Sequence, residues 1–179
     1  MAAPSDLPSA SAAPEIALVS ADSAALLDAA RMLFREYADA LAVDLGFQDF
    51  DAEVAHLPGD YTAPGGALLM ALVDGQVAGC VAMRALAECD YPNACEMKRL
   101  FVRRAFRRFG IGRLLARHLM ERATQAGYSA MLLDTLDEME TARGLYATLG
   151  FEEIPPYYYN PIPGAHYLKA HLDAPQTRW

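Results

Sequence analysis

Residues 96–115 of this chain read Glu96-Met-Lys-Arg-Leu-Phe-Val-Arg-Arg-Ala-Phe-Arg-Arg-Phe-Gly-Ile-Gly-Arg-Leu-Leu115. A short apolar segment that begins with a carboxylate leads into a basic loop with two glycines, Gly110 and Gly112. An amphipathic helical pattern starts directly after them. Glycines at a helix N-terminus let backbone N–H groups approach a phosphate closely, and the helix dipole favours negative charge there. This segment therefore predicts a binding site for a pyrophosphate.

The whole chain has the size and composition of one globular domain. It has 179 residues, of which 54% are hydrophobic and 21% charged, which suits a chain that buries a core and does not suit a disordered one. The sequence has no apolar run of about 18 residues, so we expect no membrane span. The start of the chain lacks the basic and apolar regions of a signal peptide. We expect a flexible tail over residues 1–14, a domain over 15–174 and a second tail over 175–179.

The charge of the chain is negative overall but uneven. A formal net charge of −8 and a pI of about 4.9 argue against nonspecific nucleic-acid binding. Nine of the 15 Lys and Arg residues nevertheless lie between Lys98 and Arg122. We expect a small anion to bind between Arg103 and Arg113, where the glycines are, and we expect Arg117 and Arg122 to lie on a solvated helix face.

The three cysteines, Cys80, Cys89 and Cys95, do not have the spacing of metal ligands. An odd number of cysteines also argues against a disulfide framework, so we expect a reducing, cytoplasmic setting and no metal. Cys95 stands beside Glu96 but has no neighbouring base in the sequence, which makes it a poor candidate for a catalytic nucleophile.

Hydrophobic periodicity predicts the order strand, helix, short helix, three strands, helix, strand, helix and two strands. The expected strands are 15–20, 67–73, 76–86, 94–102, 128–133, a short one after Phe151, and 165–172. The first expected helix has Ser20, Asp22 and Ser23 as N-cap candidates and ends near Leu45-Gly46. A loop or a second short helix is expected over 47–57, and further helices over 110–126 and 137–149. Helices alternate with strands only in the second half, which predicts a mixed α/β domain around one central sheet.

Local signals support several of these boundaries. Asp74-Gly75 predicts a two-residue hairpin, and Gly127 and Gly150 stand where a glycine ends a helix. Asp137-x-x-Glu140 resembles a capping box at a helix start.

Several motifs, in order, resemble the Gcn5-related N-acetyltransferase family. The segment Arg107-Arg-Phe-Gly-Ile-Gly112 is similar to its signature Gln/Arg-x-x-Gly-x-Gly/Ala, and a strand ending Arg-Leu-Phe-Val102 precedes it. A long helix and a buried strand follow, and then Ala142-Arg-Gly-Leu-Tyr-Ala-Thr-Leu-Gly-Phe151, which is similar to the family's Ala-x-x-Leu-Tyr-x-x-x-Gly-Phe helix. The resemblance covers about residues 15–172. It implies a single-domain acyl-CoA N-acyltransferase fold, with flanking helices on a mixed central sheet.

This resemblance implies acetyl-CoA as the co-substrate. The pyrophosphate would be held by backbone amides and arginines, since guanidinium groups suit phosphate oxygens. The implied residues are Arg107, Arg108, Phe109, Gly110, Ile111, Gly112 and Arg113. The backbone of Leu100, Phe101 and Val102 would pair with the pantetheine arm as a neighbouring strand does, and a backbone N–H near Leu100 would stabilise the oxyanion.

The resemblance also implies two catalytic residues. Tyr146 matches the tyrosine that protonates the leaving thiolate; the alternative is a ring that only packs between helices. Glu96 stands where some family members keep a glutamate that deprotonates the amine. The alternatives for Glu96 are an ion pair with Lys98, Arg99 or Arg84, or a contact that holds the substrate ammonium without taking its proton.

Aromatic and polar residues before the hairpin and near the last strands predict the acceptor site. The candidates are Tyr37, Phe47, Gln48, Tyr61 and Tyr158. We expect transfer of an acetyl group to a primary amine of a small molecule by direct attack in a ternary complex. A protein or peptide acetyltransferase and a non-catalytic acyl-CoA sensor are the alternatives. The expected partners are acetyl-CoA and an amine, without nucleic acid or membrane, and the sequence also allows a homodimer.

Overall fold

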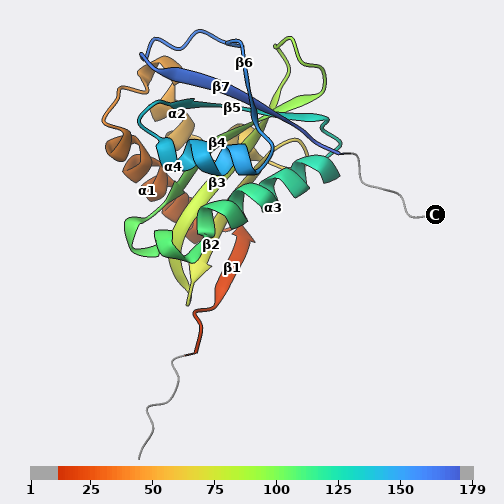
Figure 1. The fold of residues 1–179 in the computed structure, drawn as a ribbon. Coiled ribbons are helices and arrows are strands. Elements are labelled where there is room, and N and C mark those ends of the chain that lie inside the picture. The colour runs from red at the N-terminus through yellow and green to blue at the C-terminus, as the bar shows by residue number, and fades with distance from the viewer. Residues whose placement is uncertain (1–11, 174–179) are drawn as a thin grey trace, which may run out of the picture.

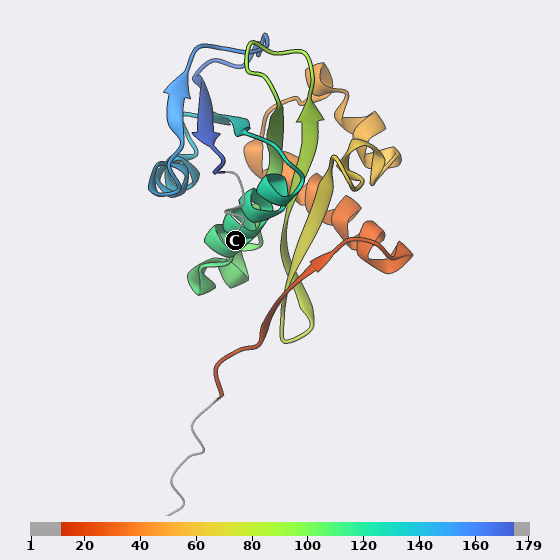
Figure 2. The same ribbon diagram turned by 90° about the vertical axis from the view of Figure 1, so that its right-hand side faces the viewer.

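The computed structural model describes residues 12–173, so most of the expected tail 1–14 and all of the tail 175–179 lie outside it. Within these residues one seven-stranded mixed sheet has the order β1-β2-β3-β4-β5-β7-β6, with helices on both faces (Figures 1 and 2). The strands are β1 (Ile16–Ser20), β2 (Ala67–Val73), β3 (Gln76–Leu86), β4 (Ala94–Val102), β5 (Ala130–Leu136), β6 (Glu152–Ile154) and β7 (Ala165–His171). The helices are α1 (Ala24–Leu41), α2 (Phe50–Ala55), α3 (Ile111–Gln125) and α4 (Glu140–Thr148), with 3₁₀ turns η1 (Gly46–Gln48), η2 (Gly59–Tyr61) and η3 (Arg104–Phe109). The predicted element order and the single central sheet are confirmed.

The first four strands form an antiparallel meander. The β2–β3 hairpin turns at Asp74 (φ 48°) and Gly75 (φ 78°), and two positive φ angles are what a type I′ turn needs. The side chains of these strands alternate between the two faces. Met70 and Cys80 belong to the core beneath α1 and α2, whereas Leu69 and Val81 belong to the core beneath α3 and α4.

The first helix begins where expected and ends early. The Ser23 side chain caps α1 by accepting a hydrogen bond from the N–H of Leu26. The helix stops at Leu41, because Ala42 adopts the left-handed conformation with φ 53°; the prediction that it reaches Leu45 was wrong. This early end leaves Val43 and Leu45 in a loop beside the sheet, where both line a pocket described below.

Two predictions about the second half of the chain were also wrong. The strand predicted over 128–133 is β5, at Ala130–Leu136, because β7 pairs with it as far as Leu136 opposite Ala165. The predicted capping box does not form. The Asp137 carboxylate instead accepts a hydrogen bond from the imidazole of His166. Helix α4 begins after Met139 without a side-chain cap.

The centre of the sheet is divided. β4 and β5 run parallel and pair only from Ala94–Ala130 to Glu96–Leu132. Beyond Glu96, β4 pairs with β3 alone and β5 pairs with β7 alone. The two strands therefore diverge, and one backbone edge of β4 from Met97 to Val102 lacks a neighbouring strand.

Candidate active site

An outer groove lies along the diverging part of β4. Its volume is about 1480 Å³, including the open solvent above it. The groove is lined by β4, by η3 with the start of α3, by the C-terminal end of α1, and by α4 with the turn before it. The lining residues are, in that order, Leu100, Phe101, Val102, Arg107, Gly110, Gly112, Arg113, Tyr37, Ala40, Leu41, Glu138, Met139, Glu140, Thr141, Ala142 and Leu145. The groove joins an exposed strand edge to a helix N-terminus.

The two glycines of the signature have different reasons to be glycine. Gly110 caps α3 in the left-handed conformation (φ 69°), which other residues adopt at a cost. A Cβ on Gly112 would meet Leu145 at 3.7 Å and Val102 at 3.9 Å, which are ordinary contacts. Packing therefore tolerates a side chain at Gly112, and its absence keeps the N-terminus of α3 open to the groove.

The arginines of this segment divide into two groups. Arg107 and Arg113 line the outer groove, and Nε of Arg107 also donates to the carbonyl oxygen of Val102 at 2.9 Å. Arg103 was expected at the anion site but turns to the other face of the sheet, where its guanidinium binds Glu36 through two hydrogen bonds of 2.9 and 2.7 Å. Seven of the ten residues predicted to hold the co-substrate line the groove, whereas Arg108, Phe109 and Ile111 do not. Their backbone amides stay a prediction.

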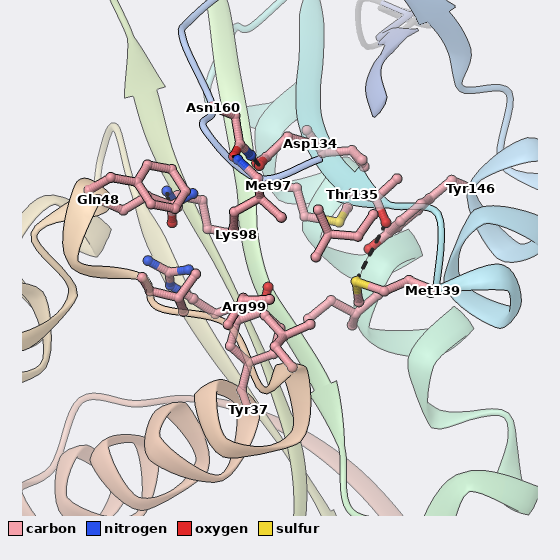
Figure 3. A pocket seen from close by; sticks show the side chains of 18 residues that line it. Tyr37, Gln48, Met97, Lys98, Arg99, Asp134, Thr135, Met139, Tyr146 and Asn160 are labelled. Atoms are coloured by element: carbon pink, nitrogen blue, oxygen red, sulfur yellow. Dashed lines mark hydrogen bonds between the residues drawn. The ribbon is translucent and has the colours of Figure 1, made fainter. Parts of the chain in front are cut away.

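A second, polar pocket adjoins the outer groove and shares Tyr37, Leu41, Leu100 and Met139 with it. Its volume is about 590 Å³, including open solvent at its mouth. Its lining comes from α1, the following loop with η1, β4, β5, α4 with the turn before it, and the loop before β7. Figure 3 shows Gln48, Lys98 and Arg99 on one side of this pocket and Thr135, Met139 and Tyr146 on the other.

A β-bulge places two consecutive cations in this polar pocket. Phe101 pairs with Cys80 and Lys98 pairs with Ala82, so β4 has one more residue than β3 between these pairs. Arg99 in the bulge has φ 60°. Consecutive residues of a regular strand point to opposite faces, but here Lys98 and Arg99 both line the pocket, and they are only 8% and 4% exposed.

Lys98 and Arg99 have different partners. Nε of Arg99 donates to Oε2 of Glu53 at 2.8 Å, and its guanidinium carbon lies 5.1 Å from the centre of the Phe50 ring. Its Nη2 is buried and has no hydrogen-bond partner in residues 12–173. Nζ of Lys98 donates to Oε1 of Gln48 at 3.3 Å, and burial lowers the pKa of Lys98 from its ordinary value.

Asp134 is a carboxylate of the polar pocket that the sequence did not single out. The hydroxyl of Tyr158 donates to its Oδ2 at 2.6 Å, and Nδ2 of Asn160 donates to the same oxygen at 3.2 Å. Asp134 and Thr135 interrupt an otherwise apolar strand, which was the signal that could have found them. Met139, from the turn before α4, was missed as well. Asn160, from the loop before β7, lies in the segment expected on the substrate side but was not among the candidates chosen from it.

Glu96 is buried, at 1% exposure, and it does not line either pocket. Nε of Arg84 donates to its Oε2 at 2.9 Å, and the hydroxyl of Tyr157 donates to its Oε1 at 3.0 Å. The structure thus contains one of the ion pairs considered for Glu96, the pair with Arg84. Its role as a base stays a prediction.

Tyr146 extends from α4 into the polar pocket (Figure 3). Its ring packs edge-on against Phe151 with centroids 5.7 Å apart, so the packing alternative coexists with a position in the site. Burial raises the pKa of the Tyr146 phenol, and the nearby Tyr37 and Asp134 raise it further. The phenol is therefore held in the protonated form that an acid catalyst requires.

The residues predicted to bind the acceptor fall into two layers. Tyr37, Phe47 and Gln48 line the polar pocket. Tyr61 and Tyr158 do not line it but contact charged residues of the site. The hydroxyl of Tyr61 donates to Glu53, and the hydroxyl of Tyr158 donates to Asp134 and accepts from Nε2 of Gln48.

Comparisons with known proteins identify this arrangement. Residues 27–151 match the family model described as the acetyltransferase (GNAT) family. The chain belongs to this family. An uncharacterised N-acetyltransferase of Schizosaccharomyces pombe is 40% identical over 147 residues, which cover 82% of this chain and 88% of that protein. The N-acetylaspartate synthetase of Homo sapiens is 37% identical over 101 residues, which cover 56% of this chain but 32% of that protein. Membership places the chain among the acetyl-CoA-dependent N-acyltransferases.

Solved GNAT structures share the fold at low identity. A GNAT acetyltransferase of Staphylococcus aureus has a TM-score of 0.72 at 17% identity and covers 89% of this chain and 100% of its own. The structure of yncA from Salmonella typhimurium with its cofactor acetyl-CoA has a TM-score of 0.67 at 19% identity and covers 92% and 99%. The predicted single-domain GNAT fold is therefore confirmed. No helix in residues 12–173 has both the length and the apolar character needed to cross a membrane.

Proposed function

We propose that this GNAT protein transfers the acetyl group of acetyl-CoA to a primary amine of a small molecule, by direct attack while both substrates are bound. The observation that carries the proposal is the junction of the two pockets. Tyr37, Leu41, Leu100 and Met139 line both, so a ligand in the outer groove and a ligand in the polar pocket would meet there.

The outer groove fits acetyl-CoA in charge and shape. The N-terminus of α3 with Arg107 and Arg113 suits the pyrophosphate. The unpaired edge of β4 at Leu100–Val102 suits the amide-rich pantetheine arm, which can accept and donate hydrogen bonds as a strand does. The thioester would then lie at the junction with the polar pocket.

The enclosure of the polar pocket supports a small acceptor. Six segments of the chain surround it, including η1 and the loop before β7. A polypeptide acceptor needs an open groove to enter, whereas this pocket suits a compact molecule. By their name, the N-acetylaspartate synthetases form N-acetylaspartate, an acetylated amino acid, and they share 33–37% identity with this chain over 101–103 residues.

The residues of the junction suit direct attack. The amine nitrogen forms a bond to the thioester carbon, and the carbonyl oxygen becomes an oxyanion that a backbone N–H near Leu100 stabilises. The carbon–sulfur bond then breaks, and Tyr146 gives its proton to the departing thiolate. An acetylated cysteine is not part of this route, because Cys95 is buried away from both pockets and burial raises the pKa of its thiol to about 12.

Two carboxylates, Asp134 and Glu96, are candidates for interaction with the acceptor amine. Asp134 lines the polar pocket directly. Glu96 lies behind the pocket, with both oxygens bound to Arg84 and Tyr157. We assign acceptor contact to Asp134 and retain Glu96 as a base that would need a water to reach the amine. The two assignments are separable by mutation.

The test of the function measures thiol release from acetyl-CoA across amines, polyamines, amino acids and short peptides, with mass spectrometry of the products. We expect an acetylated small molecule and free thiol in equal amounts. Turnover confined to peptides would favour the protein acetyltransferase instead. Tight acetyl-CoA binding without turnover of any acceptor would favour the sensor.

A further inference from the structure

Lys98 and Arg99 form a pair of buried cations on one side of the polar pocket. Lys98 precedes the bulge in β4 and Arg99 lies in it, and both lie on the side of Gln48, opposite Thr135 and Tyr146 (Figure 3). Burying a cation is unfavourable unless a counter-charge and hydrogen bonds compensate it. A counter-charge or hydrogen bond that the protein does not give these cations is therefore one that a bound ligand would supply.

The charges around the pocket pair only in part. Arg84 pairs with Glu96, and Arg99 pairs with Glu53. Within residues 12–173, Lys98 forms no ion pair, and the one hydrogen bond of its Nζ goes to the neutral amide of Gln48. Nη2 of Arg99 is buried and has no hydrogen-bond partner within the same residues. One negative charge is missing on this side of the pocket.

Asp134 is the matching charge on another side of the same pocket. It forms no ion pair in the described residues, and only the neutral donors of Tyr158 and Asn160 contact it. A ligand that completes the pocket therefore needs an anionic group toward Lys98 and Arg99 and an ammonium toward Asp134. A compact molecule with both groups is a zwitterion of the amino-acid type.

We propose that the acceptor is an amino acid whose carboxylate binds Lys98 and Nη2 of Arg99 while its amino group lies against Asp134. This proposal rests on the proposed function and names its substrate class. A carboxylate fits the site because a guanidinium and an ammonium give it charge-assisted hydrogen bonds. An amine without a carboxylate would leave Nη2 buried and unpaired, which is costly.

The experiment compares matched pairs of acceptors that differ in the carboxylate alone. Each amino acid is paired with its decarboxylated amine and its primary amide, for example alanine with ethylamine and alaninamide. The measured quantity is kcat/KM from thiol release by the wild-type protein. We expect the amino acid to exceed both partners by roughly 10- to 100-fold, the effect of losing one or two hydrogen bonds to a charged group.

Substitutions at Lys98 test where this preference arises. Lys98→Met should lower kcat/KM for the amino acid roughly 10- to 100-fold and remove most of the preference, whereas Lys98→Arg should retain the preference. Lys169→Met is the matched control, because Lys169 lies over the ring of Tyr91 outside both pockets, and we expect unchanged kinetics. Acetyl-CoA affinity reports whether each variant is folded.

The outcomes separate the two proposals. Equal or better turnover of the amines without a carboxylate would overturn the amino-acid acceptor and leave acetyl transfer standing. Preference for aminoalkylphosphonates over amino acids would overturn the carboxylate as the bound group. Equal losses of kcat/KM on both members of an acceptor pair in Lys98→Met would assign Lys98 to packing and overturn its role.

If Lys98→Met does not fold, the acceptor pairs measured with the wild-type protein and with Lys98→Arg still test the proposal. No turnover of any acceptor would overturn the proposed function, and this inference with it.

Discussion

Nε of Arg99 donates to Oε2 of Glu53 across 2.8 Å, and this ion pair connects the bulge of β4 to helix α2. The side chain of Arg99 is 2% exposed and that of Glu53 is 15% exposed. The pair holds the Arg99 guanidinium at the wall of the polar pocket. The backbone of Arg99 has the left-handed conformation, which a residue other than glycine rarely adopts. The position of the proposed carboxylate site therefore depends on a residue outside the pocket lining.

Glu53→Gln should destabilise the fold by about 3 kcal/mol, because it leaves a buried guanidinium without its counter-charge. Urea unfolding followed by circular dichroism gives this difference. Asp51→Asn, on the exposed face of the same helix, is the matched control and should change the stability by no more than about 1 kcal/mol. Equal small effects of both substitutions would contradict a structural role for the Arg99–Glu53 pair.

Tyr146→Phe should lower kcat by about 10²- to 10⁴-fold, the usual effect of removing a general acid, with little change in KM for acetyl-CoA. Tyr159→Phe is the control, because Tyr159 is 85% exposed. Burial raises the pKa of Tyr146 above the ordinary 10.0, so its proton stays bound from pH 7 to about pH 10. Wild-type kcat should not decline in this range through loss of that proton. A Tyr146→Phe enzyme with normal kcat would assign Tyr146 to packing alone.

Gly112→Ala should raise KM for acetyl-CoA at least about tenfold, since a methyl group would narrow the approach to the N-terminus of α3. The stability should not fall, because the added Cβ finds only ordinary contacts and Ala suits a helix better than Gly does. Gly144→Ala, in α4 with open space around the added Cβ, is the control and should stabilise the fold by about 0.5–1 kcal/mol without affecting KM. Unchanged KM in Gly112→Ala would argue against a pyrophosphate at this helix start.

Glu96→Gln and Asp134→Asn should differ in what they damage. Glu96 is fully buried between Arg84 and Tyr157, so its neutralisation should cost about 3 kcal/mol of stability. Asp134→Asn should instead reduce kcat/KM for the acceptor most strongly, while acetyl-CoA affinity is retained. A pH profile completes the test. If Glu96→Gln folds normally and loses activity mainly at low pH, then Glu96 acts as the base. Unchanged kcat/KM for the acceptor in Asp134→Asn would show that our assignment of acceptor contact to Asp134 is wrong.

His166 makes the stability depend on pH. Hydrogen bonds to Asp137 and Glu153 raise its pKa above the ordinary 6.5, so the folded protein holds the proton more tightly than the unfolded chain does. The stabilisation is then complete below about pH 6.5 and is lost as the pH rises through the folded-state pKa. The difference in unfolding free energy between wild type and His166→Gln should be larger at pH 5.5 than at pH 9. An identical difference at both values would show that the charge on His166 contributes nothing.

The helices, strands and outer groove were largely predictable because they follow local patterns. The periodicity of 111–125 and the glycines before it predict α3 and its open N-terminus. The apolar segment before them predicts β4. These features depend on residues close in the sequence, and the family motifs lie in the same region.

The polar pocket was less predictable because it depends on contacts between distant segments. The bulge that turns Arg99 toward Glu53 is a matter of register between β3 and β4. Asp134 became part of β5 only because β7 pairs beyond the predicted strand end. Tyr158 reaches Asp134 from an irregular loop that has no periodicity to read.

Simultaneous occupation of the two adjoining pockets is the central claim, and initial-rate kinetics test it most directly. Thiol release is measured while acetyl-CoA and the best acceptor are varied against each other. Direct attack in a ternary complex predicts double-reciprocal lines that intersect. Parallel lines, together with acetylated protein in the absence of acceptor, would show a covalent acetyl-enzyme and contradict the account.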